Sequence, residues 1–229
     1  RESLEEINAT ALEHARALGV EDSLVEFEGL TTQMIERLAE DGILNLEEFA
    51  HDPLPPAEPP SASRIRFVLV SRLLKSKGVG IFAEAARLVK KTHPRAEFHL
   101  VGPFDPNPDR VSEEQVRTWV DDGLLMHHGM IRDVGALLRT MHVFVLPTWY
   151  REGVPHAALE ALAVGRAIIT TDSSGARETV RLGEHGRRQR AAGEAVIEGA
   201  NGFLVRPREA SAVAAAMRRL RDRPAHRRG

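Results

Sequence analysis

The stretch that decides the fold is Trp149-Tyr-Arg-Glu-Gly-Val-Pro-His-Ala-Ala-Leu-Glu-Ala-Leu-Ala-Val-Gly165. The apolar run Val143-Phe-Val-Leu-Pro147 comes just before it and predicts the end of a buried strand. A short loop rich in glycine and proline follows, and residues 157–163 are strong helix formers. The order is therefore strand, tight loop, helix N-terminus. The unpaired N–H groups of a helix N-terminus favour a phosphate.

Two carboxylates lie within this unit. Glu152 precedes Gly153 of the loop, and Glu160 lies on the expected helix. Both can face one crevice, where carboxylates accept hydrogen bonds from sugar hydroxyls. Two exposed glutamates near a helix end are also common in α/β proteins, but the accompanying Gly153, Pro155 and Gly165 favour a functional interpretation. Gly153 would let the backbone approach a ligand closely.

The segment resembles the E-x7-E signature of retaining GT-B glycosyltransferases of family four, in the form R-E-G-x-P…L-E-A-x-A-x-G. The resemblance extends over about residues 50–225. It implies that Glu152 meets the donor sugar near its reacting face and that Glu160 accepts hydrogen bonds from the ribose. The N–H groups near Val154 would meet the phosphate.

Strands and helices alternate around this unit. We expect strands over 64–70, 96–101, 124–128, 143–146, 167–171 and 202–205, and helices over 79–91, 112–120, 134–140, 157–163 and 210–220. This spacing predicts right-handed βαβ units in a doubly wound parallel sheet over residues 65–225. The resemblance implies that this sheet is the Rossmann-like half of a GT-B enzyme. Ligands of such sheets bind at the carboxyl ends of the strands.

Two cations, Arg72 and Lys77, follow the first expected strand. An arginine fork and a lysine ammonium in a strand-to-helix loop suit a diphosphate, although such residues alone fit a solvated basic loop as well. The run Arg72-Leu-Leu-Lys-Ser-Lys-Gly78 also matches the family at both positions. By resemblance, Arg72 and Lys77 hold the donor diphosphate and stabilise the departing nucleotide. No metal or other cofactor is expected, because no D-x-D signature lies in a suitable loop, which fits a mechanism in which these cations replace a divalent ion.

The third expected strand leads into a further candidate contact. By resemblance, the backbone near Ile131, after Gly129, meets the nucleobase, although a simple turn fits these residues nearly as well. The adjacent His127 and His128 point to opposite faces of a strand, so we expect a structural role and no shared metal. An NAD-binding domain is disfavoured, because no G-x-G-x-x-G follows the first strand.

Two features depart from the family pattern. His156 stands where the family often has Arg or Lys, which leaves a phosphate or acceptor contact there open. Residues 183–200, including Arg187-Arg-Gln-Arg190, lengthen a connection that the family crosses in a few residues. We expect this insertion to be a flexible basic surface loop.

Acidic and basic residues are distributed unequally along the chain. Residues 1–52 hold 14 Asp and Glu against 3 Lys and Arg, a balance of −11, whereas the remainder holds 19 and 28, a balance of +9. Residues 1–50 predict an acidic helix-hairpin-helix segment, although composition alone fits a solvated helical bundle equally well. Its glutamates would repel phosphate, so no direct binding of nucleic acid is expected. The runs 13–30 and 39–50 resemble the C-terminal acidic repeat of the NusA family, which implies contact with RNA polymerase or with other parts of a NusA protein.

Residues 51–64 form a proline-rich join that is expected to be extended. Our hypothesis is that a NusA-like tail and a glycosyltransferase-like half meet here, through a gene fusion or an assembly artefact. The resemblance implies a domain that binds a nucleotide sugar, UDP-sugar above all. The acceptor domain that precedes it in GT-B enzymes is absent from these residues, so we expect little transfer by this chain alone. The alternative function is the transcription-factor interaction module of residues 1–50.

Composition bounds the location of the protein. The chain has no cysteine, and none of its 229 residues belongs to an apolar run long enough to span a membrane. These features are compatible with the cytoplasm or the inner face of a membrane. The family implies a saccharide or a lipid-linked acceptor.

Overall fold

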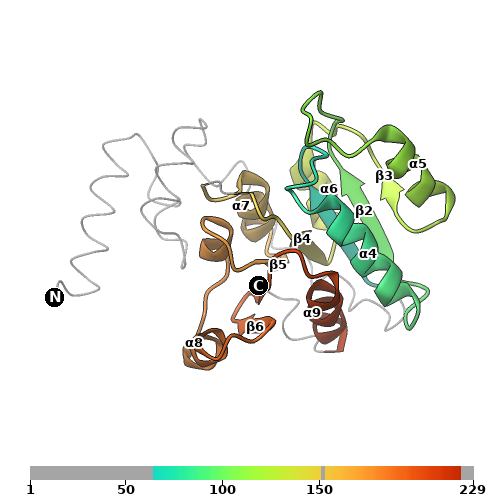
Figure 1. Cartoon of the computed structure of the whole chain (residues 1–229). Coiled ribbons are helices and arrows are strands. Elements are labelled where there is room, and N and C mark those ends of the chain that lie inside the picture. The colour runs from blue at the N-terminus through green and yellow to red at the C-terminus, as the bar shows by residue number, and fades with distance from the viewer. Residues whose placement is uncertain (1–63, 151–152, 223–229) are drawn as a thin grey trace, which may run out of the picture. The chain divides into compact units, whose positions relative to one another are not determined.

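The computed structural model of the chain describes residues 64–150 and 153–222 (Figure 1). The predicted helix-hairpin-helix segment (1–50) lies outside this range, as does nearly all of the proline-rich join (51–64). Both therefore stay predictions. The same holds for Glu152, which falls in the gap between the two ranges.

A sheet of seven strands forms the centre of the described residues, in the order β3-β2-β1-β4-β5-β7-β6. Six strands run parallel, and β6 runs antiparallel to β7 at one edge. The predicted parallel sheet is thus confirmed for six strands, and the antiparallel edge is new. The strands are β1 (Arg66–Val70), β2 (Glu97–Val101), β3 (Met126–His127), β4 (Val143–Leu146), β5 (Ala167–Thr171), β6 (Val196–Gly199) and β7 (Gly202–Val205).

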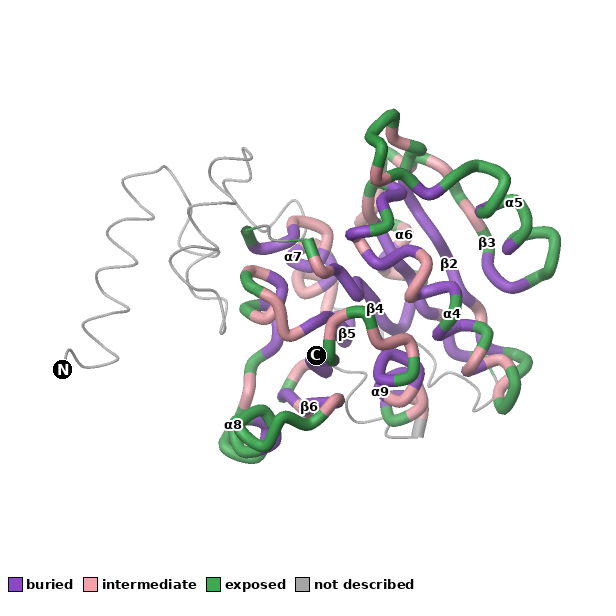
Figure 2. Tube along the Cα trace, in the orientation of Figure 1, coloured by how far each residue is buried: buried purple, intermediate pink, exposed green. Residues whose placement is uncertain are grey.

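The central strands are apolar because helices cover both faces of the sheet. Every residue of β4 and β5 is buried, and Phe67 of β1 stacks on Phe98 of β2 with ring centroids 5.2 Å apart. A parallel sheet covered in this way needs continuous apolar runs rather than alternation. Figure 2 shows the central strands as the buried interior, whereas most of the exposed residues lie on the outer helices and loops.

Helices connect the strands. Helix α4 packs against α9, and α6 packs against α7. Because βαβ crossovers are right-handed and the chain leaves β1 and β4 in opposite directions, these two pairs cover opposite faces of the sheet. No helix among the described residues combines the length and the apolar composition needed to cross a bilayer. The helices are α4 (Val79–Lys90), α5 (Glu113–Asp121), α6 (Val134–Thr140), α7 (His156–Ala163), α8 (Glu184–Ala191) and α9 (Ala210–Asp222), with a 3-10 turn η1 (Ala176–Thr179).

The bounds of most elements agree with the sequence-based expectation to within two residues. Ser112 caps α5 as expected, since its side chain accepts a hydrogen bond from the N–H of Gln115 at 3.2 Å. The third strand is shorter than expected, because only Met126 and His127 pair with β2.

The expectation of a flexible loop over 183–200 is wrong, because this insertion folds into α8 and β6. The buried side chain of Gln189 holds the two together: its amide oxygen accepts from the N–H of Glu198 at 2.9 Å, and its amide group donates to Glu194 at 2.9 Å. Gly186 lets α8 lie on β6, since a Cβ there would sit 2.2 Å from the carbonyl oxygen of Glu198. Val196 and Ile197 then enter the core. Because this segment contains glycines and a run of arginines, hydrophobic periodicity in the sequence did not predict the helix.

Gly78 and Gly80 provide a matched test of the fold. Gly78 has φ 81°, and a Cβ there would sit 2.2 Å from the carbonyl oxygen of Pro147, whereas a Cβ on Gly80 would meet nothing within 4 Å. Gly78→Ala should therefore cost more than about 1 kcal/mol of unfolding free energy. Gly80→Ala, inside α4, should gain up to about 1 kcal/mol. Urea unfolding of both variants measures the difference, and equal midpoints would contradict the close packing of Gly78.

Candidate functional site

The carboxyl edge of the sheet holds the candidate site. β1 and β4 are neighbours, but the chain continues from β1 to β2 on one side and from β4 to β5 on the other. In open α/β sheets, ligands bind beside such a reversal of strand order. The loops that leave β1 and β4 are also the two that carry most of the predicted site residues.

Arg72 and Lys77 both lie on the loop that connects β1 with α4. The exposed guanidinium of Arg72 donates from Nη1 to Oδ2 of Asp105 at 3.0 Å. The half-buried Lys77 places its Nζ 5.8 Å from the centroid of the Tyr150 ring, in the segment that follows β4. An ammonium at that distance over a tyrosine face gains from a cation–π contact. The structure thus brings Lys77 next to the loop that leads to α7.

The two loops are joined through their backbones. The carbonyl oxygen of Ser76 accepts from the N–H of Trp149 at 2.9 Å and from the hydroxyl of Thr148 at 3.2 Å. Gly78 approaches Pro147 in the same region. The loop with the two cations is therefore held directly against the end of β4.

A third loop, which follows β2, supports the same segment. Oδ2 of Asp109 accepts hydrogen bonds from both the hydroxyl and the backbone N–H of Ser76, the latter at 3.0 Å. The Ser76 hydroxyl, followed by the Ser76 N–H, lowers the pKa of Asp109 below its ordinary value of 3.8. Asp109 is not among the site residues that the sequence predicts. The alternation Asp105-Pro-Asn-Pro-Asp109 was its only signal, since such residues favour turns.

The start of α7 follows directly on the loop after β4. The helix begins at His156, and its N-cap residue, Pro155, makes no side-chain capping hydrogen bond. Gly153 is exposed, and a Cβ there would meet nothing within 4 Å, whereas the side chain of Val154 is buried. The positive end of the helix dipole lies at this end of α7, and it favours an anion.

Glu160 lies one turn into α7, on the same face as His156. Its side chain is 17% exposed, and its Oε1 lies 3.4 Å from Nδ1 of His156. His156, which replaces the Arg or Lys of the family pattern, thus contacts a predicted site residue. The spacing between the carboxylates of Glu160 and Glu152 stays a prediction, because Glu152 lies outside the described residues.

Gly129 and Ile131 follow β3 at the same edge of the sheet. Gly129 has φ 65°, which glycine adopts without strain, and its carbonyl oxygen accepts from the N–H of Gly102 at 2.8 Å. Ile131 is half-buried and packs against the core. The turn is therefore held to the end of β2, and its contact with a nucleobase stays a prediction.

His127 of β3 and the adjacent His128 take different partners, as their alternation predicts. Nε2 of His127 lies 3.2 Å from the carbonyl oxygen of Gly102, whereas Nε2 of His128 lies 2.9 Å from Nδ1 of His99. Burial, then the neighbouring His128, lowers the pKa of His99 to about 4. Burial also lowers the pKa of His128. The pair is therefore neutral at pH 7, with one ring donating to the other.

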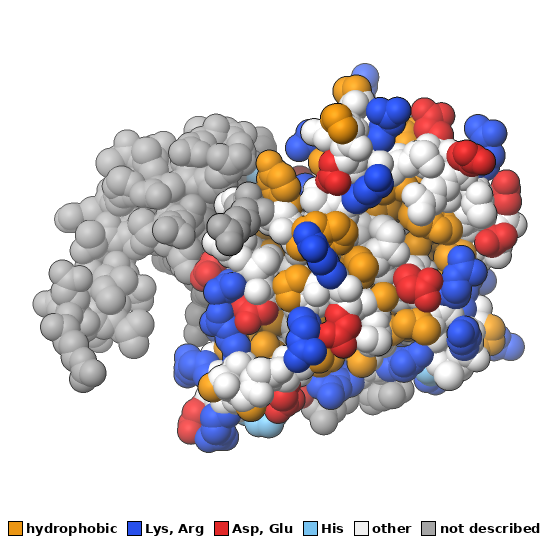
Figure 3. All heavy atoms as spheres, in the orientation of Figure 1, with side chains coloured by type: hydrophobic (Ala, Val, Ile, Leu, Met, Phe, Trp, Pro, Cys, Tyr) orange, Lys and Arg blue, Asp and Glu red, His pale blue; other side chains and the backbone are white. Residues whose placement is uncertain are grey.

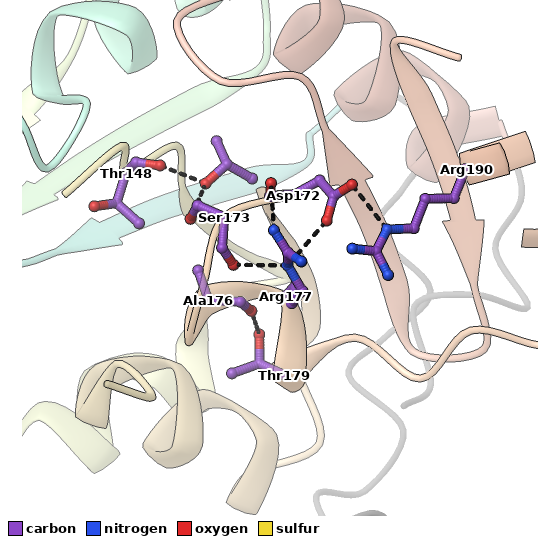
Figure 4. A network of polar contacts seen from close by, with 8 residues as sticks. Thr148, Asp172, Ser173, Ala176, Arg177, Thr179 and Arg190 are labelled. Atoms are coloured by element: carbon purple, nitrogen blue, oxygen red, sulfur yellow. Dashed lines mark hydrogen bonds and ion pairs between the residues drawn. The ribbon is translucent and has the colours of Figure 1, made fainter. Parts of the chain in front are cut away.

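Sequence analysis also missed a polar network beside the site, drawn in Figure 4. The hydroxyl of Thr171 donates to the carbonyl oxygen of Thr148, which connects the ends of β5 and β4. The carboxylate of Asp172 pairs with Nε of Arg177 at 3.1 Å and with Nε of Arg190 at 2.9 Å. Because Arg190 belongs to α8, this network attaches the insertion to the carboxyl edge. Among the described residues, no three His, Asp or Glu side chains gather as a metal site requires.

The chain belongs to the family described as glycosyl transferases group 1, whose sequence model matches residues 64–223. The match covers the whole α/β sheet and leaves out the acidic N-terminal residues. The resemblance found in the sequence is thus confirmed at the level of the family.

Several curated proteins are similar over this region. One is N,N'-diacetylbacillosaminyl-diphospho-undecaprenol alpha-1,3-N-acetylgalactosaminyltransferase of Campylobacter jejuni, 37% identical over 49% of this chain and 28% of its own length. Another is the amylovoran biosynthesis glycosyltransferase AmsK of Erwinia amylovora, 28% identical over 60% of this chain and 32% of its own length. The chain therefore spans about a third of the length of these relatives.

Solved structures share the fold. The C-terminal domain of a glycosyl transferase group 1 family protein (LpcC) from Francisella tularensis has a TM-score of 0.58 at 21% identity, over 80% of this chain and 89% of that one. Anabaena HepE in complex with UDP has a TM-score of 0.59 at 17% identity, over 98% of this chain and 71% of that one. At these identities the likeness establishes the GT-B-type α/β fold.

Ser76→Ala tests the support that Asp109 gives to the loop. A carboxyl whose folded pKa lies below its unfolded value adds stability above the unfolded value, here 3.8, and loses it as the pH falls through the folded value. Without the Ser76 hydroxyl, the pKa of Asp109 should rise towards 3.8. The variant should thus be less stable than the parent at pH 7, and the difference should shrink below 3.8.

NMR titration of the Asp109 carboxyl and urea unfolding at both pH values measure this effect. Ser71→Ala is the matched control, because the Ser71 hydroxyl donates to the carbonyl of Arg72 and not to Asp109. An unchanged Asp109 pKa in Ser76→Ala would contradict the assigned cause.

Proposed function

We propose that residues 65–225 of this group 1 glycosyl transferase bind the nucleoside diphosphate of a sugar donor at the carboxyl edge of the sheet. One observation carries the proposal: the loop with Arg72 and Lys77 is hydrogen-bonded to the segment at the end of β4, and this segment leads into the N-terminus of α7. Two cations and a helix N-terminus around one reversal of strand order suit a diphosphate. Arg72 and Lys77 hold its oxygens, and the N–H groups near Val154 of the Gly153-Val154 turn add to them.

The same cations serve the chemistry in this proposal. In glycosyl transfer, the bond between the anomeric carbon and the diphosphate oxygen breaks, and this oxygen gains negative charge. Arg72 and Lys77 stabilise that charge where it develops, without a metal ion. The anomeric carbon forms its new bond with an acceptor hydroxyl oxygen, which loses its proton. Glu152 contacts the donor sugar, and the transfer retains the anomeric configuration. Glu160 accepts hydrogen bonds from the ribose, and the backbone of Gly129 and Ile131 meets the nucleobase.

The proposed classes of donor and acceptor are based on the proteins to which this chain is similar. Solved neighbours hold UDP, UDP-glucose, or UDP with glucose, which makes a UDP-sugar our proposed donor. The name of the Campylobacter relative includes a diphospho-undecaprenol-linked sugar, which makes a lipid-linked saccharide our proposed acceptor. Because the match covers about a third of such relatives, we propose that these residues alone support little transfer.

We place this function in the cytoplasm, at the inner face of a membrane where a lipid-linked acceptor is exposed. Figure 3 shows basic and acidic side chains interspersed over one face of the described residues rather than gathered in a single basic patch. On that face, electrostatic attraction to anionic lipids is therefore not the main reason for proposing a membrane location. The reason is the proposed lipid-linked acceptor.

Calorimetric titration with UDP, with GDP and ADP as comparisons, tests the donor site. We expect saturable binding, weakened at least about tenfold by Arg72→Ala and by Lys77→Ala, because hydrogen bonds to charged groups contribute about 1.5–3 kcal/mol. Arg87→Ala and Lys91→Ala are matched controls, since both side chains lie on or next to α4, near its far end. The proposal fails if no diphosphate binds, or if the controls weaken binding as much as the site variants do.

Glu160 can be tested through the ribose. Glu160→Gln replaces a charged acceptor with a neutral amide, so UDP binding should weaken about three- to tenfold. The loss should be smaller for 2′-deoxy-UDP, which lacks one of the hydroxyls that Glu160 would accept from. Glu178→Gln, on the exposed surface of η1, is the control. An equal loss for the two nucleotides would contradict the ribose contact.

A further inference from the structure

Arg72 is an exposed cation held at a single point. Its side chain is 59% exposed, and its Nη1 donates to Oδ2 of Asp105 at 3.0 Å. A long side chain in solvent loses rotamer freedom when it is held in this way, and exposed ion pairs contribute little to folding stability. The fold gains little from the pair. Its main effect is on where the guanidinium lies.

Asp105 is itself a fixed acceptor. Only 12% of its side chain is exposed, and its Oδ1 accepts from the N–H of Asn107 at 2.8 Å. Pro106 and Pro108 flank Asn107 and restrict the backbone of this turn. Because each carboxylate oxygen has a partner, the carboxylate has one preferred orientation and imposes it on Arg72.

The two loops are also joined along their backbones. The N–H of Leu73 donates to the carbonyl of Pro103 at 3.1 Å, and the N–H of Val111 donates back to the carbonyl of Leu73 at 2.8 Å. The N–H of Lys75 donates to the carbonyl of Asp109 at 2.8 Å. These bonds hold the loop after β1 and the loop after β2 in one register, so Arg72 and Asp105 stay opposite one another.

The ion pair leaves most of the arginine available. A guanidinium has five N–H donors, and within the described residues only one of those of Arg72 is used, by Asp105. The remaining donors can still grip two phosphate oxygens at once. Asp105 therefore orients the guanidinium of Arg72 and leaves its other N–H donors available to a ligand.

We propose that Asp105 is a positioning residue for the diphosphate site: it holds the Arg72 guanidinium ready for the phosphate oxygens and does not touch the ligand. This inference rests on the proposed function. Binding then needs less ordering of a long side chain, so the pair increases affinity for the part of the donor that Arg72 contacts. Asp105 should have no effect on the nucleoside part.

The test compares UDP and uridine on the full chain by ligand-observed NMR, which reaches millimolar dissociation constants. Asp105→Asn keeps an amide oxygen for the N–H of Asn107 but removes the charged acceptor of Arg72. UDP should bind about three- to tenfold more weakly, the cost of ordering one long side chain on binding. Uridine binding should not change. Glu84→Gln is the matched control, since Glu84 forms an exposed ion pair with Arg87 on α4.

A double-mutant cycle separates positioning from a structural role. In an Arg72→Ala background, Asp105→Asn should have no further effect on UDP. An equal loss in that background, an equal loss for uridine, or unchanged UDP affinity in the single variant would overturn the role of Asp105. Failure of the parent chain to bind UDP, GDP or ADP would instead overturn the proposed function, and this inference with it.

Discussion

Burial of the parallel sheet on both faces constrains everything else in the described residues. Strands such as β4 and β5 are buried at every position, so they leave no room for a solvated ligand along their length. The charged groups of the candidate site gather where the strands end. At the carboxyl edge, the loops after β1, β2 and β4 meet and bond to one another through Ser76, Asp109 and Trp149. The candidate site is a product of this packing.

The sheet could be predicted because its strands are continuous apolar runs and its turns carry clear signals. Val143-Phe-Val-Leu146 and Ala167-Ile-Ile-Thr-Thr171 form strands with the expected bounds, and Ser112 caps its helix. The insertion at 183–200 could not be predicted in this way. The surface of α8 is charged and its helix carries a glycine, so no apolar period marks it, and β6 is recognisable only through its pairing with β7. Tertiary contacts decide the structure of such segments.

The candidate site likewise has residues that could be predicted from the sequence and residues that could not. Arg72, Lys77 and Glu160 could be proposed from short motifs, because their spacing relative to strand and helix ends is local. The groups that hold them could not, since those contacts join residues far apart in the chain. Arg72 and Asp105 are 33 residues apart, as are Ser76 and Asp109. A motif thus indicates which side chains face a ligand, whereas the structure identifies the residues that orient them.

The central claim is that the carboxyl edge around Arg72 and Lys77 binds the diphosphate of a nucleotide sugar. A crystal structure of the chain with UDP tests it most directly. The account predicts diphosphate oxygens within hydrogen-bonding distance of both Arg72 and Lys77, with the base beside Ile131 and the ribose at Glu160. A nucleotide ordered elsewhere on the domain, or one whose phosphates point away from the loop after β1, would contradict it.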